Sequence, residues 1–156
     1  MAPWRTPDTV IMTVSRAAVQ RVNIMAQKLF ASQQPLTNVL CVAVAGGPDI
    51  LPYRGMRIVI NENWNETSRI VNGQDAMLVS NHGHTIIIQF PDGEHAFVYP
   101  VTHPVEGEGD VTQYPFTPAY ARMICKSQGQ NLKHLLVWLD CPTVTPGLAY
   151  VAISRV

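Results

Sequence analysis

A run of small and polar residues, Lys126-Ser127-Gln128-Gly129, follows a segment that we expect to be helical, where that helix gives way to a loop. Exposed backbone amides and a glycine let such a loop approach a phosphate closely, while Ser and Gln add directional hydrogen bonds and Lys adds a mobile charge. The alternative is a helix end that only faces water. By themselves these residues leave both interpretations open.

A histidine cluster and one cysteine could also carry chemistry. His82, His84 and His95 could approach one another across a hairpin and hold a metal ion, but no acidic or thiol ligand accompanies them, so we expect no metal site. Cys125 beside Lys126 could be a nucleophile of lowered pKa, but no ordered His and Asp accompany it, and this favours a helix-end residue without a catalytic role.

Trp64 lies between two asparagines in a segment rich in polar residues. Its ring could stack on unpaired bases, or it could pin a loop to the core. The sequence does not separate these two roles.

The first element that positions these residues is a strand over 9–14, followed by Ser15, which can cap a helix over 16–31. The helix is expected to bury an apolar stripe. Its members are Ala18, Val22, Met25, Ala26 and Leu29. A continuous apolar run at 39–44 predicts a strand covered on both faces, so the opening third reads as strand, helix, strand.

The middle of the chain, from Leu51, has a different pattern. Short strands are predicted at 57–60, 75–79, 85–90 and 95–99, separated by Asn72-Gly73, His82-Gly83 and Asp92-Gly93. This spacing is typical of an antiparallel meander or small barrel. The Gly- and Glu-rich segment 106–110 is expected to be a flexible, acidic exit from it.

The last third returns to the first pattern. We expect an extended segment at 113–117, a helix at 119–126, a fully apolar strand at 135–139 and a helix over 148–156. The simplest organisation is an α/β domain formed by 1–50 and 111–156 that is interrupted by an all-β insertion at 51–110.

Composition limits the classes of function. The 156 residues include 11 Lys and Arg against 11 Asp and Glu, and only 14% are charged while 47% are hydrophobic. These values exclude a disordered chain and a generally basic nucleic-acid-binding surface, so any such site must be local. No apolar run approaches the ~20 residues that span a bilayer, so we expect a soluble, intracellular protein without a membrane partner.

Four blocks of the sequence together resemble superfamily 1 DNA helicases of the RecD/Pif-type branch. Residues 119–132 (AYARMICKSQGQNL) and 147–155 (GLAYVAISR) are similar to motifs V and VI of that family. Residues 13–23 (TVSRAAVQRVN) are similar to its motif IV segment. Residues 55–60 (GMRIVI) with 71–76 (VNGQDA) resemble the opening of its SH3-like insertion. All blocks occur in the family's order.

The resemblance implies a second RecA-like motor domain of the P-loop NTPase class, with a parallel sheet and helices, interrupted by a small SH3-like antiparallel β-barrel. Arg155 then matches the arginine finger that reaches the γ-phosphate of ATP, and Arg16 is a further nucleotide-side candidate whose alternative is a solvated residue. Motif V implies contacts with the backbone of single-stranded DNA. The matching residues are Lys126, Ser127, Gln128, Gly129 and Gln130, of which Gly129 and Gln130 also adjoin the nucleotide.

Three positions depart from the family pattern. Met123 stands where Thr is usual, Cys125 where His is usual and Asn131 where Thr is usual. These changes remove polar partners for DNA or for the other motor domain, so they bear on how well the two sites are coupled.

The phosphate-cradling half of an ATP site is absent from this sequence. A Walker A loop needs Gly-Lys followed by Ser or Thr, and none of the three lysines here follows a glycine; no adjacent Asp-Glu pair is present either. The chain alone should therefore not hydrolyse ATP, and it would use ATP and Mg²⁺ only when joined to an N-terminal RecA-like motor domain.

Two functions follow. The first is the C-terminal half of an ATP-dependent DNA helicase of 5′ to 3′ polarity, nuclear or nucleoid-associated when it works. The alternative is an inactive, helicase-derived remnant that acts as a weak module for binding single-stranded DNA or protein.

Overall fold

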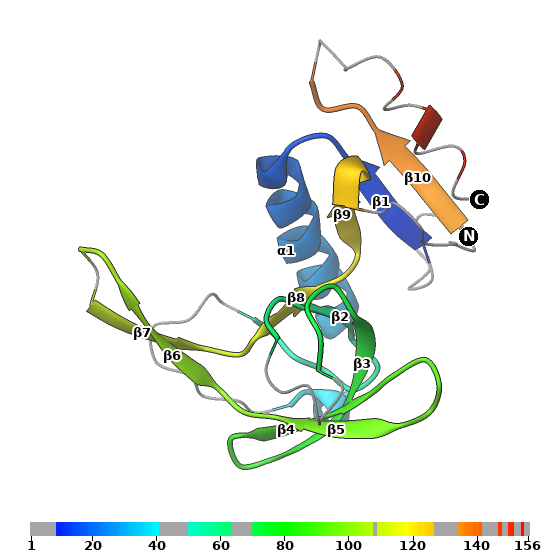
Figure 1. Cartoon of the computed structure of the whole chain (residues 1–156). Coiled ribbons are helices and arrows are strands. Elements are labelled where there is room, and N and C mark those ends of the chain that lie inside the picture. The colour runs from blue at the N-terminus through cyan, green and yellow to red at the C-terminus, as the bar shows by residue number, and fades with distance from the viewer. Residues whose placement is uncertain are drawn as a thin grey trace. The chain divides into compact units, whose positions relative to one another are not determined.

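The computed structural model describes residues 9–40, 50–63, 70–107, 109–126, 134–141, 147, 150–151 and 154. Two compact units make up the chain. Met1–Ala26 and Ala119–Val156 form the first, and Gln27–Pro118 forms the second. Each is described separately below (Figure 1).

The first unit is built on a parallel sheet of three strands in the order β10-β1-β9. Its members are β1 (Thr9–Thr13), β9 (Ala121–Met123) and β10 (His134–Trp138). On one side, β1 pairs with β10 from Thr9↔His134 to Thr13↔Trp138. On the other side, it pairs with β9 from Ile11↔Ala121 to Thr13↔Met123. The parallel sheet expected from the sequence is therefore confirmed.

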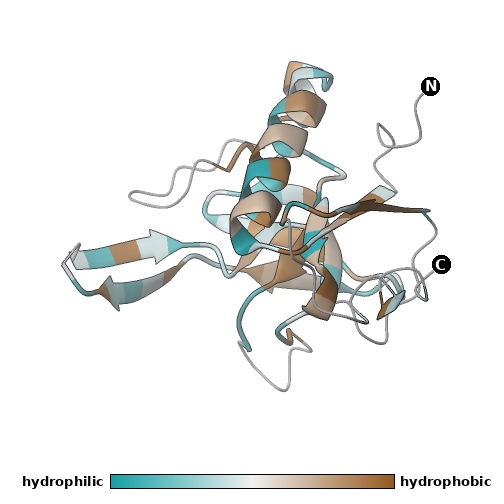
Figure 2. Ribbon diagram, turned by 90° about the horizontal axis from the view of Figure 1, so that it is seen from above, coloured by the Kyte–Doolittle hydropathy of each residue, from teal (hydrophilic) through white to brown (hydrophobic). Residues whose placement is uncertain are grey.

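Helix α1 (Arg16–Ser32) follows β1, as expected, and Ser15 caps it, because the Ser15 Oγ accepts a hydrogen bond from the amide of Ala18 at 3.1 Å. The expected apolar stripe is only partly correct. Ala18 is buried, but Met25 is 64% exposed and Leu29 is 41% exposed. The polar residues Asn23 and Gln27 are buried instead. Apolar and polar residues alternate around this helix (Figure 2).

The helix expected at 119–126 is wrong. The segment forms β9 and a short 3-10 helix, η4 (Ile124–Lys126). The reason is tertiary, since this chain pairs in parallel with β1 and the side chain of Asn23 binds the amides of Tyr120 and Ala121. Those amides are consequently not available to start a helix.

The strand expected at 135–139 is confirmed as β10. Leu136, Val137 and Trp138 are 36–39% exposed, because β10 ends the described part of the sheet. Of the helix expected at 148–156, only Tyr150, Val151 and Ser154 are described, and the first two are helical.

Of the strand expected at 39–44, only Val39 and Leu40 lie within the described residues. Val39 follows a short 3-10 helix, η2 (Leu36–Asn38), and forms an isolated antiparallel bridge with Tyr53. The remainder of that expected strand lies outside the described residues.

The second unit contains a five-stranded antiparallel sheet in the order β5-β4-β3-β2-β8. The strands are β2 (Arg57–Ile60), β3 (Asp75–His82), β4 (Thr85–Gln89), β5 (His95–Val98) and β8 (Phe116–Pro118). Alternate residues face a core that includes Ile58, Leu78, Ile86, Ile88 and Phe116, each no more than 1% exposed. The four strands expected between 57 and 99 are thus confirmed.

Two turns of this sheet need glycine. Gly73 and Gly93 have φ of 86° and 92°, a region that residues with a Cβ rarely adopt. The amide of Gly73 donates to Ile60 O at 2.8 Å, and that of Gly93 donates to Phe90 O at 2.9 Å. The Asn-Gly and Asp-Gly pairs therefore mark turns, as expected.

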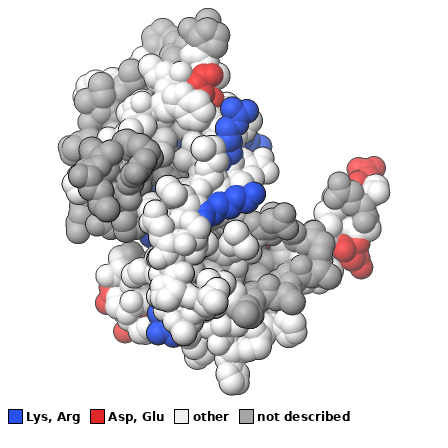
Figure 3. Space-filling model, turned by 180° about the vertical axis from the view of Figure 1, so that it is seen from behind, with Lys and Arg blue, Asp and Glu red and all other residues white. Residues whose placement is uncertain are grey.

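Within the segment expected as a flexible exit, 106–110, the described residues Glu106 and Gly107 form a turn, and Gly109 and Asp110 belong to a strand. They lie at the end of a hairpin made by β6 (Val101–Val105) and β7 (Gly109–Gln113), which pair from Val101↔Gln113 to Val105↔Gly109. Thr102 and Thr112 share a hydrogen bond of 2.8 Å across it. Acidic side chains gather at its end (Figure 3).

The described strands of the second unit do not close into a barrel, because β5 and β8 end the sheet and are not paired with each other. The expected bounds of the insertion, 51–110, stay a prediction; the second unit extends from Gln27 to Pro118. No helix in the described part of the chain is long and apolar enough to cross a membrane.

Candidate nucleic-acid interface at the carboxyl edge of the parallel sheet

The three parallel strands of the first unit end at one edge of their sheet. Strand β1 leads into Ser15 and Arg16, β9 leads into η4 with Lys126, and β10 leads into Asp140. In open α/β sheets, ligands bind outside the carboxyl ends of the strands. The fold therefore brings the sequence-predicted residues Arg16 and Lys126 to the edge where a ligand is expected.

Asp140 ties two of these strand ends together. Its Oδ1 accepts a hydrogen bond from the amide of Val14 at 2.7 Å, and its Oδ2 accepts one from the amide of Ser15 at 3.2 Å. The hydrogen bond from the Ser15 side chain, followed by those from the backbone amides, holds the pKa of the Asp140 carboxyl below its usual value. The carboxylate is therefore ionised at neutral pH.

The hydrogen bonds to Asp140 limit what the loop after β1 can bind. Amides at a strand-to-helix junction are the groups that hold a phosphate in many nucleotide sites. Here those of Val14 and Ser15 are taken by Asp140, and a negative charge lies beside them. The amides of Val14 and Ser15 are therefore not available to hold a nucleotide phosphate.

The end of β9 is fixed by the core. Ile124 is 1% exposed and packs with Met12, which is fully buried, against Val14, Leu135 and Val151. With Ile124 held inside, the next two residues point outward, and Cys125 and Lys126 are exposed. The ammonium of Lys126 is thus a single mobile charge at this edge that can approach an anionic group.

Asn23 fixes the start of the same strand. Its Oδ1 accepts hydrogen bonds from the amides of Tyr120 at 3.0 Å and Ala121 at 2.8 Å, and its Nδ2 donates to Ala121 O at 3.3 Å. The side chain is only 8% exposed. Asn23 therefore clamps β9 to α1, and it positions the segment that carries Lys126.

Arg16 is exposed in the first turn of α1, and Lys126 is exposed at the end of η4. The other proposed site residues lie outside the described residues. They are Ser127, Gln128, Gly129, Gln130 and Arg155. Asn131 and Trp64 also lie outside the described residues. Their roles stay predictions.

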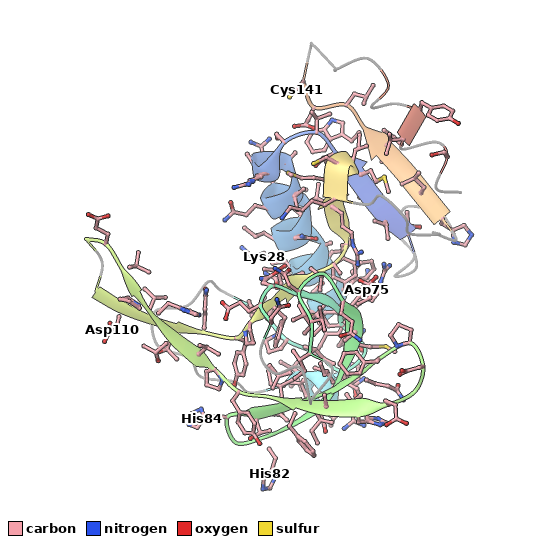
Figure 4. All side chains as sticks on the ribbon, viewed as in Figure 1. Lys28, Asp75, His82, His84, Asp110 and Cys141 are labelled. Carbon is pink, nitrogen blue, oxygen red and sulfur yellow. The ribbon has the colours of Figure 1, made fainter. Side chains whose placement is uncertain are left out.

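The three histidines of the hairpin region do not converge. His82 pairs with Thr85 at one end of β4, and His95 pairs with Gln89 at the other end, so the two lie about 14 Å apart along the strand. His82 and His84 lie at the β3–β4 turn, where their side chains point away from each other (Figure 4). Among the described residues no group of three or more His, Cys, Asp or Glu side chains could hold a metal ion.

Asp140 and the clamp role of Asn23 were not predicted from the sequence. One signal could have pointed to Asp140, because it directly follows the apolar strand at 135–139 and parallel strands end at a common edge. Asn23 carries no comparable signal, since its partners lie 97 and 98 residues away in the chain.

No protein-family model matches the chain. Among curated proteins, it is 27% identical over 145 residues to the ATP-dependent DNA helicase Pif1 of Bdellovibrio bacteriovorus. This match covers 89% of the chain and 32% of that helicase, so the chain spans about a third of its relative's length.

Solved structures of Pif1 helicases have the same fold. Bacteroides Pif1 bound to ssDNA matches 96% of the chain with a TM-score of 0.69 at 20% identity, over 38% of its own length. Pif1 helicase from Candida albicans matches 95% with a TM-score of 0.66 at 19% identity, over 42% of its length. Nothing in these similarities favours an inactive remnant.

The family expected from the motifs is therefore confirmed. Over 89% of its length the chain is similar to a Pif1 DNA helicase, and the part that it matches is consistent with the C-terminal portion of a superfamily 1 helicase of this type.

Proposed function

We propose that this chain is the C-terminal part of an ATP-dependent DNA helicase, in which the carboxyl edge of the parallel sheet holds the backbone of single-stranded DNA. The observation that carries the proposal is the meeting of the ends of β1, β9 and β10 at one edge, with exposed Lys126 on it. The similarity to Pif1 helicases supports the same assignment.

In this proposal Lys126 and the residues that follow, Ser127, Gln128, Gly129 and Gln130, contact phosphates and sugars. Such contacts position a strand without reading its sequence, and they suit a motor that must move along any sequence. Asn23 and Ile124 hold the strand from which this segment leaves, so a displaced DNA backbone would push on β9 and, through its pairing, on β1.

The nucleotide would lie between this domain and an N-terminal RecA-like motor domain, which would supply the Walker A loop and the Mg²⁺ ligands. Arg155 is proposed as the arginine finger, because a guanidinium is always charged and its rigid fork matches phosphate oxygens. Arg16 is the second candidate on the nucleotide side. The 5′ to 3′ polarity and an SH3-like closure of the second unit belong to the same proposal, and so does an intracellular location with DNA.

The DNA contact can be tested with the chain itself. Fluorescence anisotropy with a labelled oligothymidylate is measured from 50 to 300 mM salt for the protein and for Lys126→Ala. The variant should bind more weakly, and its plot of log affinity against log salt should lose about 0.7 in slope, the value for one phosphate contact on a single strand. Arg54→Ala, which removes an exposed charge from the second unit, is the matched control. Equal slopes for Lys126→Ala and the unchanged protein would contradict the contact.

A further inference from the structure

The edge strand of the antiparallel sheet presents three rings on its solvent face. Along β5 the residues alternate, so that Ala96 and Val98 are at most 7% exposed while Phe97 is 57% exposed. His95 lies on the same side as Phe97 and is exposed, and Tyr99, which continues the alternation just after β5, is 48% exposed. Strand β5 ends its sheet among the described strands (Figure 1).

The spacing of these rings has a chemical meaning. Two residues along an antiparallel strand rise about 6.8 Å, which is twice the ~3.4 Å between stacked bases of one DNA strand. A flat base therefore fits between successive rings, or on the face of each. Aliphatic side chains in the same places would offer area, but not this repeated flat contact.

The neighbouring strand, β4, places two more side chains beside these rings. Gln89 lies opposite His95 and Ile87 lies opposite Phe97, both on β4 and both partly exposed. Ile87 gives an apolar floor beside the Phe97 ring, and Gln89, whose Nε2 donates to Gly93 O at 3.3 Å, has a side-chain oxygen that can accept from a base edge. Met77, 40% exposed on β3, lies opposite Gln89 and extends the floor.

The charges around the platform are mixed. Arg57 and Asp75 lie on the same face of the sheet, and Asp92 and Glu94 are exposed in the turn between β4 and β5. Phosphates therefore gain little here, and a site for anions is not favoured. Bases gain from the rings, which are tolerant of sequence because every base has a flat face.

We propose that Phe97, Tyr99 and His95 form a stacking platform that binds unpaired bases of single-stranded nucleic acid, separate from the backbone contact at Lys126. The inference rests on the proposed function, because it takes single-stranded nucleic acid to be the ligand of the protein. It differs in the chemistry of contact, because the platform binds bases and the carboxyl edge binds phosphates.

Two different probes distinguish the base contact at Phe97 from the backbone contact at Lys126. Anisotropy is measured with a labelled 15-nucleotide oligothymidylate and with a strand of equal length whose central sites are abasic. Phe97→Ala should weaken binding of the oligothymidylate about 5-fold to 100-fold, as found when single stacking aromatics are removed, and leave its salt slope unchanged. It should leave binding of the abasic strand unchanged. Phe97→Trp should restore the affinity, and Leu36→Ala, which truncates a 91% exposed apolar side chain, is the control.

A second readout does not depend on a variant. Irradiation of a 5-iodouracil-substituted strand on the unaltered protein should give a crosslinked peptide that contains Phe97 or Tyr99. Loss of affinity for Lys126→Ala together with equal binding by Phe97→Ala and no crosslink on β5 would overturn the platform while the backbone contact stands. Failure of the unaltered protein to bind oligothymidylate would overturn both.

Discussion

Replacing Asn23 with alanine should destabilise the first unit more than any other single polar truncation among the described residues of that unit. The side chain makes three hydrogen bonds to the chain at 120–121, two of them accepted from amides at 3.0 and 2.8 Å. Tyr120 and Ala121 are each only 3% exposed, so water does not readily replace the lost partner. The helix itself gains nothing from Asn, which is a modest helix former.

The magnitude follows from these contacts. Leaving one buried donor without a partner costs about 1–3 kcal/mol, and Asn23→Ala removes the acceptor of two donors at once. A loss of about 2–5 kcal/mol is therefore expected, which is a large part of the ~5–15 kcal/mol that stabilises a typical domain. Alanine's better helix propensity returns about half a kcal/mol at most.

The assay is amide hydrogen exchange together with urea unfolding. In the unaltered protein the amides of Tyr120 and Ala121 should be protected, and in Asn23→Ala they should exchange at least tenfold faster. Asn38→Ala is the control, because the Asn38 Nδ2 donates a single hydrogen bond of 3.2 Å to Gln34 on a partly exposed surface. The reasoning is refuted if Asn23→Ala costs no more stability than Asn38→Ala, or if the two amides exchange at the same rate with and without the Asn23 side chain.

Two further predictions concern pH. Because the pKa of Asp140 is lowered in the fold, its carboxylate stabilises the native state at pH values above the ordinary pKa of about 3.9, and this stabilisation is lost as pH falls through the folded pKa. Urea midpoints measured from pH 6 to 2.5 should therefore fall less for Asp140→Asn than for the unaltered protein. Parallel curves for the two proteins would contradict the hydrogen bonds assigned to Asp140. Burial raises the pKa of Tyr114, whose hydroxyl donates to His84 O at 2.8 Å, so its contribution is present below about pH 10 and lost as pH rises through the folded pKa. Tyr114→Phe should cost about 0.5–1.5 kcal/mol at pH 7 and lose less stability than the unaltered protein between pH 9 and 11, and an identical alkaline loss in both would sink this assignment.

Local signals in the sequence were sufficient for β1, the Ser15 cap, α1 and the hairpin turns. Each of these is decided by residues within a few positions of one another, such as the cap bond from the Ala18 amide to Ser15 or the positive φ of Gly73. The order of the motifs was also sufficient to predict the similarity to Pif1-type helicases. These features required no knowledge of which distant segments pack together.

Non-local contacts decided the features that the sequence did not predict. Segment 119–126 has apolar residues at helical spacing, yet pairing with β1 and the Asn23 clamp make it a strand and a 3-10 helix. The hairpin β6–β7 was missed because Pro104 and the glycines at its tip are poor strand residues, whereas Pro104 is tolerated on a two-stranded ribbon. On α1, Asn23 and Gln27 take the buried face because their hydrogen-bond partners lie beyond the helix, at 120–121 and at Leu51.

The most direct test of the central claim is DNA-stimulated ATP hydrolysis by this chain joined to a matching N-terminal motor domain of a Pif1-type helicase. The joined protein should hydrolyse ATP when single-stranded DNA is added and unwind duplexes that carry a 5′ tail, and Arg155→Ala should lower turnover by about a thousandfold or more, as expected for an arginine finger. Arg54→Ala, on the second unit, should leave turnover unchanged. Equal DNA-stimulated turnover with and without Arg155, or a joined protein that DNA does not stimulate at all, would contradict the assignment of this chain as the C-terminal part of a helicase motor.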